Sequence, residues 1–322
     1  MGLKKKIRAL MFESTSGQIL FYKLRILREK KAMRTNDYDT IQRIYRERFF
    51  REANLADPKT YTEKLQWLKL FYRDPTLPIC SDKYRIREYL KECNLEWLAN
   101  DALGVYTDAK DIDFDKLPNR FVAKATHGSG WNIICTDKSK FDRKGNVKLM
   151  NAWLKLDLSA FGREWNYAEI EPRIVVEKFI DHQPLNDYKY MCFNGEPLYM
   201  QLNNDFEGSH YVDFYQLDGW KHLPFTYGPY HISQNRKIDP PPMHEKMMEL
   251  ARILSKPVPF VRVDFYNYDD TVILGELTFF PGGGLWPLNP VQTGYDEILG
   301  KRLKLPEPNH NLELLAKLKE KA

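Results

Sequence analysis

The segment from residue 188 to residue 202 constrains the fold most strongly. Its runs 188–193 and 197–202 are rich in aromatic and aliphatic residues, and Asn194-Gly195 lies between them. Asn-Gly favours the two-residue turn whose twist matches antiparallel strands, so the segment predicts a β-hairpin. The runs 260–266 and 272–279 predict a second hairpin. We therefore expect an antiparallel sheet in the C-terminal half.

Apolar spacing elsewhere predicts helices and short strands. We expect helices at 38–53, 62–73, 82–93, 146–158 and 243–255, with Ser81 as the N-cap of the third. Further strands are expected at 121–124, 132–136, 174–180 and 212–217. The polar stretch 107–119 is interpreted as a domain connection. This order of elements predicts an α+β fold.

Charge and composition exclude several classes of protein. The net charge is only +5, and basic residues are interleaved with acidic ones, which argues against a nucleic-acid-binding module. No apolar run reaches the ~18–20 residues of a membrane helix. The four cysteines lack CxxC spacing, which argues against a zinc site. We expect a cytoplasmic protein.

Basic residues are concentrated at the N-terminus. Residues 1–35 hold 10 of the 49 Lys and Arg but only 2 of the 44 Asp and Glu, so the other 287 residues carry 39 basic against 42 acidic. The pattern near residues 20–28 predicts a basic amphipathic helix. Two interpretations stay open: a helix packed on the body with a solvated basic face, or contact with an anionic membrane surface.

The second hairpin carries the residues best suited to chemistry. Arg262 and Asp264 share one face of their strand, and Glu276 and Thr278 share one face of theirs. Two carboxylates beside an arginine favour a divalent cation with bound phosphates. A simple cross-strand ion pair between Arg262 and Glu276 is an equally good interpretation of the hairpin alone.

A glycine loop is the second candidate. His127-Gly128-Ser129-Gly130 lies between two predicted strands, where backbone N–H groups favour a phosphate. An ordinary turn explains the same four residues. The P-loop and Rossmann motifs are absent from the sequence.

The ordered set of motifs resembles the ATP-grasp superfamily, and within it the TupA-like ATP-grasp family. The resemblance spans about residues 38 to 305. It is carried by Asp82-Lys83, the strand and loop 121–132, the strand 176–180, residues 187–189, and the pair 262–264 and 276–278. Residues 60–67 and 187–195 indicate the TupA-like branch.

The resemblance implies an ATP-grasp fold of several parts. Residues 1–35 would form the basic arm, 36–117 an N-terminal α/β subdomain, 118–180 a small α+β lid, and 181–322 a C-terminal α+β subdomain. ATP would lie between the last two parts.

The resemblance also implies site residues, with ATP and Mg²⁺ as cofactors. The catalytic residues would be Arg262, Lys189 and His127, although a loop histidine bonded to the backbone is a competing interpretation. The ATP-binding residues would be Lys83, Lys124, His127, Gly128, Ser129, Gly130, Glu177, Lys178, Phe179, Ile180, Asp187, Lys189 and Arg262. Asp264, Glu276 and Thr278 would bind Mg²⁺, and Gly282, Gly283, Gly284 and Trp286 the substrate.

Two features depart from the ATP-grasp pattern. Thr278 stands where many members have Asn, and a hydroxyl binds magnesium less well than an amide carbonyl. Either a second metal ion is held weakly, or Asn289 or water substitutes for the missing ligand. The glycine loop has only two glycines, which makes its flexibility less assured.

The resemblance implies an ATP-dependent carboxylate–amine ligase that works through an acyl phosphate. Its carboxylate would be a uronic acid of a bacterial surface polysaccharide or precursor, and its amine an amino acid or amino alcohol. Alternatives are a glycan kinase that uses the same site and a glycosyltransferase. The expected localisation is cytoplasmic, with the N-terminal arm at the inner membrane surface as a further hypothesis.

Overall fold

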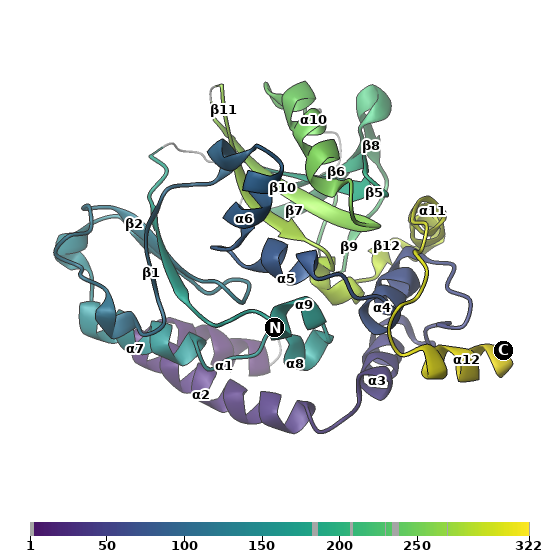
Figure 1. The fold of residues 1–322 in the computed structure, drawn as a ribbon, viewed down its shortest axis with the longest axis horizontal. Coiled ribbons are helices and arrows are strands. Elements are labelled where there is room, and N and C mark those ends of the chain that lie inside the picture. The colour runs from purple at the N-terminus through teal and green to yellow at the C-terminus, as the bar shows by residue number, and fades with distance from the viewer. Residues whose placement is uncertain are drawn as a thin grey trace. The chain divides into compact units, whose positions relative to one another are not determined.

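The structure, a computed structural model, describes residues 3–181, 186–206, 209–228, 230–233, 238–268 and 270–321 (Figure 1). Met1 and Gly2 of the predicted arm lie outside these residues. Contacts divide the chain into two compact units. Unit 1 comprises Met1–Asn36, Thr76–Glu92 and Ala99–Asp181, and unit 2 comprises Asp37–Pro75, Cys93–Leu98 and His182–Ala322. Both units combine helices with strands, so the predicted α+β class is confirmed.

Unit 1 is built on a four-stranded antiparallel sheet in the order β1-β4-β2-β3. Its strands are β1 (Ala102–Tyr106), β2 (Phe121–Ala125), β3 (Asn132–Cys135) and β4 (Ile174–Lys178). Alternate residues of β2 are buried, including Phe121 and Ala123, whereas β4 buries residues 174–177 on both of its faces. Phe121, Ala123 and Val176 lie on the core face of the sheet. This face packs into one hydrophobic core with residues of α2 (Thr15–Ala32) and α7 (Arg143–Trp153). Figure 1 shows the two helices side by side.

The other helices of unit 1 are short. They are α1 (Leu3–Phe12), α5 (Thr76–Ser81), α6 (Ile86–Glu92), α8 (Ser159–Gly162) and α9 (Trp165–Ala168), with 3₁₀ turns at Ala109–Asp111 and Lys138–Lys140. Residues 107–119 lie within unit 1 and add Ile112, Phe114 and Leu117 to its core.

Three predicted helices need corrected boundaries. The helix expected at 38–53 ends at Phe49, because Phe50 adopts a positive φ of 58°. The helix expected at 82–93 begins only at Ile86, because Asp82 Oδ1 accepts the N–H groups of Tyr84 and Arg85 and holds a turn there. Ser81 ends α5 instead of capping α6, and its hydroxyl donates back to Leu77 O. The helix expected at 146–158 is α7, at Arg143–Trp153. It begins earlier because Asp142 accepts the N–H of Gly145 as the N-cap.

Unit 2 is built on a six-stranded antiparallel sheet in the order β11-β10-β5-β6-β7-β8. Its strands are β5 (Asn186–Phe193), β6 (Glu196–Phe206), β7 (Ser209–Gln216), β8 (Lys221–Leu223), β10 (Phe260–Tyr268) and β11 (Thr271–Thr278). Both predicted hairpins are confirmed. At the first turn, Asn194 and Gly195 have positive φ angles of 52° and 87°, as the primed two-residue turn requires. The sequence patterns did not indicate β1, β8, or the short pair β9 (Thr226–Tyr227) and β12 (Leu288–Asn289).

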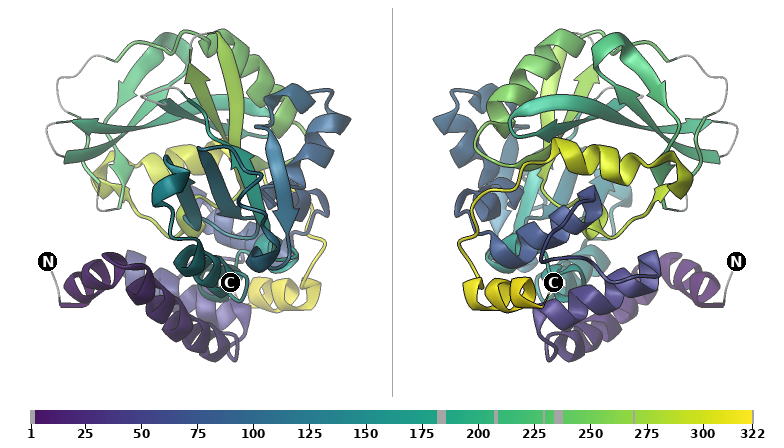
Figure 2. Two further views of the ribbon diagram at one scale, coloured as in Figure 1. Left: turned by 90° about the vertical axis from the view of Figure 1, so that its left-hand side faces the viewer. Right: turned by 90° about the vertical axis from the view of Figure 1, so that its right-hand side faces the viewer.

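Helices of unit 2 cover this sheet and extend the unit. They are α3 (Asp37–Phe49), α4 (Tyr61–Phe71), α10 (His244–Ser255), α11 (Tyr295–Arg302) and α12 (Leu312–Glu320). Their 3₁₀ turns lie at Glu96–Leu98, Asp218–Trp220, Pro281–Gly284 and Val291–Thr293. Helix α10 packs against β5, β6 and β10 (Figure 2). Among the described helices, none is both long and apolar enough to cross a membrane.

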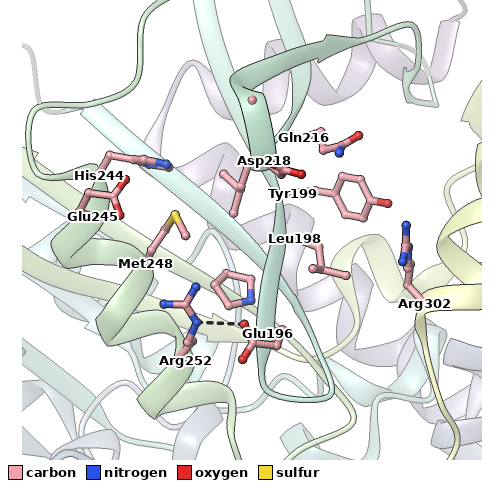
Figure 3. Close-up of a pocket in the computed structure, with 13 residues that line it drawn as sticks. Glu196, Leu198, Tyr199, Gln216, Asp218, His244, Glu245, Met248, Arg252 and Arg302 are labelled. Atoms are coloured by element: carbon pink, nitrogen blue, oxygen red, sulfur yellow. Dashed lines mark hydrogen bonds and ion pairs between the residues drawn. The ribbon is translucent and has the colours of Figure 1, made fainter.

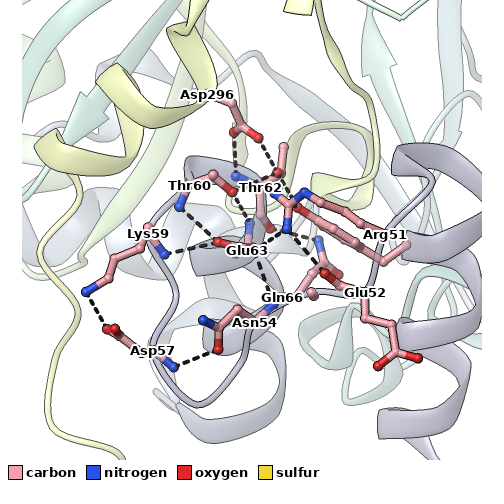
Figure 4. Close-up of polar contacts among 12 residues, drawn as sticks. Arg51, Glu52, Asn54, Asp57, Lys59, Thr60, Thr62, Glu63, Gln66 and Asp296 are labelled. Atoms are coloured by element: carbon pink, nitrogen blue, oxygen red, sulfur yellow. Dashed lines mark hydrogen bonds and ion pairs between the residues drawn. The ribbon is translucent and has the colours of Figure 1, made fainter. Parts of the chain in front are cut away.

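Helix α4 is buried on almost every side, polar residues included. Thr60 and Glu63 form a capping box at its N-terminus. The Glu63 carboxylate also accepts the N–H groups of Asn54 and Lys59, each at 3.1 Å, and pairs with Arg51 (Figure 4). These contacts fix the start of the helix to the loop that precedes it.

Candidate active site

Six polar side chains gather on one face of the unit 2 sheet. They come from the neighbouring strands β5, β10 and β11. Asp264 is paired in register with Lys189 on one side and with Glu276 on the other, while Arg262 is opposite Thr278. Directly opposite residues share a face of a sheet. The full set is Asp187, Lys189, Arg262, Asp264, Glu276 and Thr278.

A bulge in β11 sets the direction of Glu276. The register shifts between Asp264 and Phe265, so that Phe265 pairs with Leu274 while Asp264 pairs with Glu276, and Gly275 is the extra residue. A side chain at Gly275 would lie only 3.1 Å from the carbonyl oxygen of Asp264. The bulge therefore lets Leu274 join the core while Glu276 joins the polar face.

Asp264 is the centre of the cluster. Its two oxygens accept from Arg262 Nε at 2.7 Å and Nη2 at 2.6 Å, and Lys189 Nζ donates to Oδ2 at 2.9 Å. Arg262 Nη2 also donates to Glu276 Oε1 at 3.2 Å. Lys189 in addition pairs with Asp187. The cluster thus holds three carboxylates and two cations, and Asp264, Lys189 and Arg262 are largely buried.

Burial and neighbouring charges shift the titration of these groups. Burial raises the pKa of Asp187 to about 6; Asp264 adds to this effect and Lys189 opposes it. For Lys189 and Arg262, burial disfavours the charged form, but the nearby carboxylates outweigh it and raise both pKa values. Both cations therefore stay charged at neutral pH.

The donor set fits a magnesium ion. Mg²⁺ is usually held by one or two carboxylates together with phosphates and water. Asp264 and Glu276 supply two carboxylates from adjacent strands, and the hydroxyl of Thr278 lies 3.0 Å from Glu276 Oε1. Within the described ranges, no three His, Cys, Asp or Glu side chains form a ready metal cluster. Phosphate oxygens would thus have to complete the coordination.

Unit 1 contains a second charged group, on β2 and β4. Lys124 Nζ donates to Glu177 Oε2 at 2.6 Å, and Arg87 Nη2 donates to Oε1 at 3.2 Å. Glu177 is buried, whereas the Lys124 side chain is 24% exposed. Two cations share one carboxylate, which leaves a local excess of positive charge that favours an anion.

Lys178 lies apart from Lys124. It is paired in register with Phe121, whose side chain faces the core side of the sheet, whereas Glu177 and Lys124 face the other side. Its ammonium is exposed and lies 3.7 Å from Asp101. Phe179 and Ile180 follow the end of β4 and are half-buried, with Arg120 over the Phe179 ring. The structure therefore does not bring the two predicted phosphate-binding lysines together.

The glycine loop connects β2 to β3. Ser129 and Gly130 are exposed, and Gly130 has φ of 73°. Gly128 packs so closely on Trp131 that a Cβ there would lie 2.2 Å from the ring, and its carbonyl accepts from Lys83. Lys83 thus supports the loop in this structure.

His127 is buried beneath the same loop. Its Nε2 lies 3.1 Å from the carbonyl oxygen of Trp153, and burial lowers its pKa. In the described part of the chain, Nδ1 has no hydrogen-bond partner. This geometry favours the backbone-bonded interpretation of His127 over direct contact with a reacting group.

The triple-glycine turn follows β11 and packs on α4. Gly282, Gly283 and Gly284 all have positive φ. Lys69 Nζ donates to Gly283 O at 2.7 Å, and Gln66 Nε2 donates to Gly284 O at 2.8 Å. The glycines are thus needed for the turn and its close packing, and α4 fixes its position.

Trp286 and Asn289 follow this turn. The Trp286 indole packs edge-on against Tyr227 and Tyr230 and is half-buried. The side-chain amide of Asn289 donates to Gly228 O at 2.8 Å, so Asn289 is engaged with the backbone there.

A separate pocket of about 530 Å³ lies in unit 2, between α10 and the β6–β7 region (Figure 3). Its lining includes Glu196, Tyr199, His244 and Arg302. None of the predicted site residues lines it.

Sequence patterns missed Arg87, Gln66 and Lys69. The sequence predicted that Arg87 lies in a helix but assigned it no role, because its partner Glu177 is 90 residues away in the chain. Gln66 and Lys69 lie in and beside the segment 60–67 that indicates the TupA-like branch. A lysine and a glutamine inside a largely apolar helix were the available signal.

Comparison with known proteins gives a family and several distant structures. D-alanine–D-alanine ligase from Helicobacter pylori is 13% identical, with 72% of this chain and 60% of that chain covered and a TM-score of 0.39. The corresponding enzyme from Bacillus anthracis is 18% identical, with 76% and 68% covered and a TM-score of 0.40. N5-carboxyaminoimidazole ribonucleotide synthetase from Thermus thermophilus is 9% identical, with 68% and 51% covered and a TM-score of 0.35.

The curated proteins contain no match to this chain. The family comparison is different, since the TupA-like ATP-grasp family matches residues 63–304, about three quarters of the chain. This range contains every predicted site residue and both hairpins, and it confirms the resemblance inferred from the motifs. The chain belongs to the TupA-like ATP-grasp family.

Proposed function

We propose that the protein is an ATP- and Mg²⁺-dependent carboxylate–amine ligase that forms an amide through an acyl phosphate. The observation that carries the proposal is the polar face of the unit 2 sheet, where Asp264 binds both Arg262 and Lys189 and lies beside Glu276. Membership of an ATP-grasp family supports the use of ATP.

In this proposal the buried cations act on the transferred phosphoryl group. A substrate carboxylate oxygen attacks the γ-phosphorus of ATP, and the bond to the β–γ bridging oxygen breaks to release ADP. Arg262 and Lys189 stay charged at neutral pH because of their carboxylate partners, so they can stabilise the negative charge on the γ-phosphoryl group.

Asp264 and Glu276 would hold Mg²⁺ through their carboxylate oxygens, with Thr278 beside them. The ion, when bound, neutralises phosphate charge. In the second half-reaction an amine nitrogen attacks the carbonyl carbon of the acyl phosphate. Inorganic phosphate and a proton leave, and the amide remains.

Unit 1 would contribute to nucleotide binding. Lys124 is partly exposed and shares Glu177 with Arg87, so an anionic phosphate can compete for its ammonium. The exposed Ser129 and Gly130 would offer backbone N–H groups to phosphate. Phe179 and Ile180, after β4, would contact adenine.

The proposed carboxylate is a uronic acid of a bacterial surface polysaccharide or its precursor, and the amine is an amino acid or amino alcohol. The TupA-like branch of the family supports this choice. Trp286, which packs edge-on against Tyr227 and Tyr230, gives an aromatic surface on which a sugar ring can stack. The neighbouring glycine turn would then contact the carboxylate or acyl phosphate.

Purified protein with ATP, Mg²⁺, a uronate and a panel of amines tests the proposal through ADP release and product mass. We expect a condensed amide. Absence of Mg-ATP binding by calorimetry would reject the ATP site itself. A product that gains phosphate without amine identifies a kinase, and UDP release from a UDP-sugar without ATP identifies a glycosyltransferase.

Two variants test the metal ligands. Glu276→Gln is the cleaner one, because this side chain is 36% exposed and its loss leaves Asp264 to neutralise Arg262. Asp264→Asn removes the central charge and is expected to lower stability as well as turnover. Both should abolish ADP release, whereas Glu249→Gln on α10, whose side chain is exposed, should not. Full turnover by Glu276→Gln would reject its assignment as a ligand.

A further inference from the structure

Helix α2 exposes a row of leucines. Leu20, Leu24 and Leu27 are 53%, 44% and 64% exposed. Their spacing of four and three residues places them on one side of the helix. Isolated exposed leucines are ordinary, but three in one row on a helix of about 27 Å form a continuous apolar stripe. We call these three residues the leucine stripe.

The opposite side of α2 is fully engaged with unit 1. Tyr22 is buried in the core, and Ile26 packs against it. Glu29 is 3% exposed, pairs with Arg25 at 2.7 Å and accepts the N–H of Asp157 at 3.0 Å. The helix therefore has two apolar sides, and packing within unit 1 accounts for only one of them.

Basic residues flank the leucine stripe. At 100° per residue, Lys23 and Lys30 lie along one side of it, Arg28 lies along the other, and Lys31 continues its line. All four are exposed. Glu29, the one acidic residue in the sequence of α2, is on the buried side. The exposed side is thus apolar at its centre and positive at its margins.

We propose that this face of α2 binds an anionic lipid surface. The leucines would enter the boundary between headgroups and acyl chains, and the flanking cations would contact lipid phosphates. A second copy of the chain is a poorer partner, because pairing two such faces would bring their lysines and arginines together. The proposal goes beyond the catalytic function and does not depend on it.

Vesicle flotation of the full-length protein tests the proposal. The probes are vesicles of equal parts phosphatidylglycerol and phosphatidylcholine, and vesicles of phosphatidylcholine alone. We expect binding to the anionic vesicles only, with a loss at high salt. The variant Leu20→Gln/Leu24→Gln/Leu27→Gln should bind more than about tenfold more weakly. Each of Lys23→Gln and Arg28→Gln should weaken binding about fivefold.

Matched controls alter exposed residues of α12, in unit 2. Leu312→Gln removes an exposed leucine of α12, and Lys317→Gln/Lys319→Gln removes exposed charges of the same helix; both should bind as the unaltered protein does. Far-ultraviolet circular dichroism and ADP release should be unchanged in the leucine variant, which separates this test from that of catalysis. Equal binding by the leucine variant, or no binding by the unaltered protein, overturns the proposal. The proposal is also overturned if the unaltered protein forms a dimer but does not bind vesicles, and if the leucine variant is a monomer.

Discussion

Helices α4 and α2 depart from the usual distribution of side chains in opposite directions. Helix α4 buries Glu63, Gln66 and Lys69, whereas α2 exposes its leucine stripe. The polar residues of α4 have hydrogen-bond partners within unit 2, including backbone groups of the glycine turn. The leucines of α2 face solvent. In this protein, buried polar residues fix internal geometry, whereas the exposed apolar residues of α2 indicate an external partner.

Glu63→Gln is expected to have the largest effect among substitutions in α4. Both carboxylate oxygens of Glu63 accept from backbone N–H groups, Asn54 on one oxygen and Lys59 and Thr60 on the other. Either orientation of a glutamine amide would place a donor against a donor. We expect a loss of about 3 kcal/mol in the free energy of unfolding, measured by urea denaturation. Glu52→Gln, at an exposed ion pair, is the control.

Glu63 should also make the free energy of unfolding depend on pH. Burial acts to raise the pKa of Glu63, but hydrogen bonds from Arg51 and three backbone N–H groups outweigh it and lower the pKa below 4.5. A lowered carboxyl pKa stabilises the fold above the unfolded value, and this stabilisation is lost as pH falls through the folded value. The difference between the unaltered protein and Glu63→Gln should therefore shrink below pH 4.5. A constant difference would contradict the assignment.

Lys69→Met should have the next largest effect. It removes the ammonium group that donates to Gly283 O while it keeps most of the side-chain volume. Gln66 Nε2 still contacts the same carbonyl oxygen at 3.2 Å, so we expect a loss of about 2 kcal/mol in the free energy of unfolding. Lys319→Met on α12, where the lysine is exposed, should change stability little. Equal effects of the two variants would show that Lys69 does not fix the turn.

Thr60→Ala removes the hydroxyl that accepts the Glu63 N–H at 3.2 Å. Loss of an N-cap side chain typically costs about 1 kcal/mol, and the other half of the capping box remains, in which the Thr60 N–H donates to the Glu63 carboxylate. Thermal unfolding with Thr60→Ser as the conservative partner measures the difference. If Thr60→Ser lowers stability as much as Thr60→Ala, the loss comes from the packing of the threonine methyl group and not from the hydroxyl that caps the helix.

The smallest effect is expected at α2. Leu24→Gln exchanges an exposed side chain, so the free energy of unfolding should change by less than about 0.5 kcal/mol. Tyr22→Gln, two residues earlier on the buried side, should cost about 3 kcal/mol or more. A large loss in Leu24→Gln would mean that the leucine stripe packs within the protein.

The sequence predicted most of the sheet of unit 2, because strand alternation and an Asn-Gly turn are local signals. It also predicted that Arg262, Asp264 and Glu276 would lie on one face, and the structure brings them together. The bulge at Gly275 was not foreseen, since no local signal distinguishes it from an ordinary strand glycine. The roles of these residues stay predictions.

Unit 1 was harder to predict in detail. Lys124 and Lys178 were expected to share a ligand, but two strands and their register decide that Lys178 faces away. Burial of His127 depends on its contacts with the ring of Trp131 and with the backbone carbonyl of Trp153. The partner of Arg87 is likewise set by tertiary structure, because the spacing of residues along the sequence does not show which distant residues come into contact.

The buried carboxylate of Glu29 determines whether α2 can roll about its axis. A half-turn would bring the leucines inward, but it would carry Glu29 away from the N–H of Asp157 and lift Tyr22 out of the core. Both changes would raise the free energy of the folded chain, so α2 keeps its observed orientation. The outward direction of the leucines is therefore a permanent property of the folded chain, present before any partner arrives.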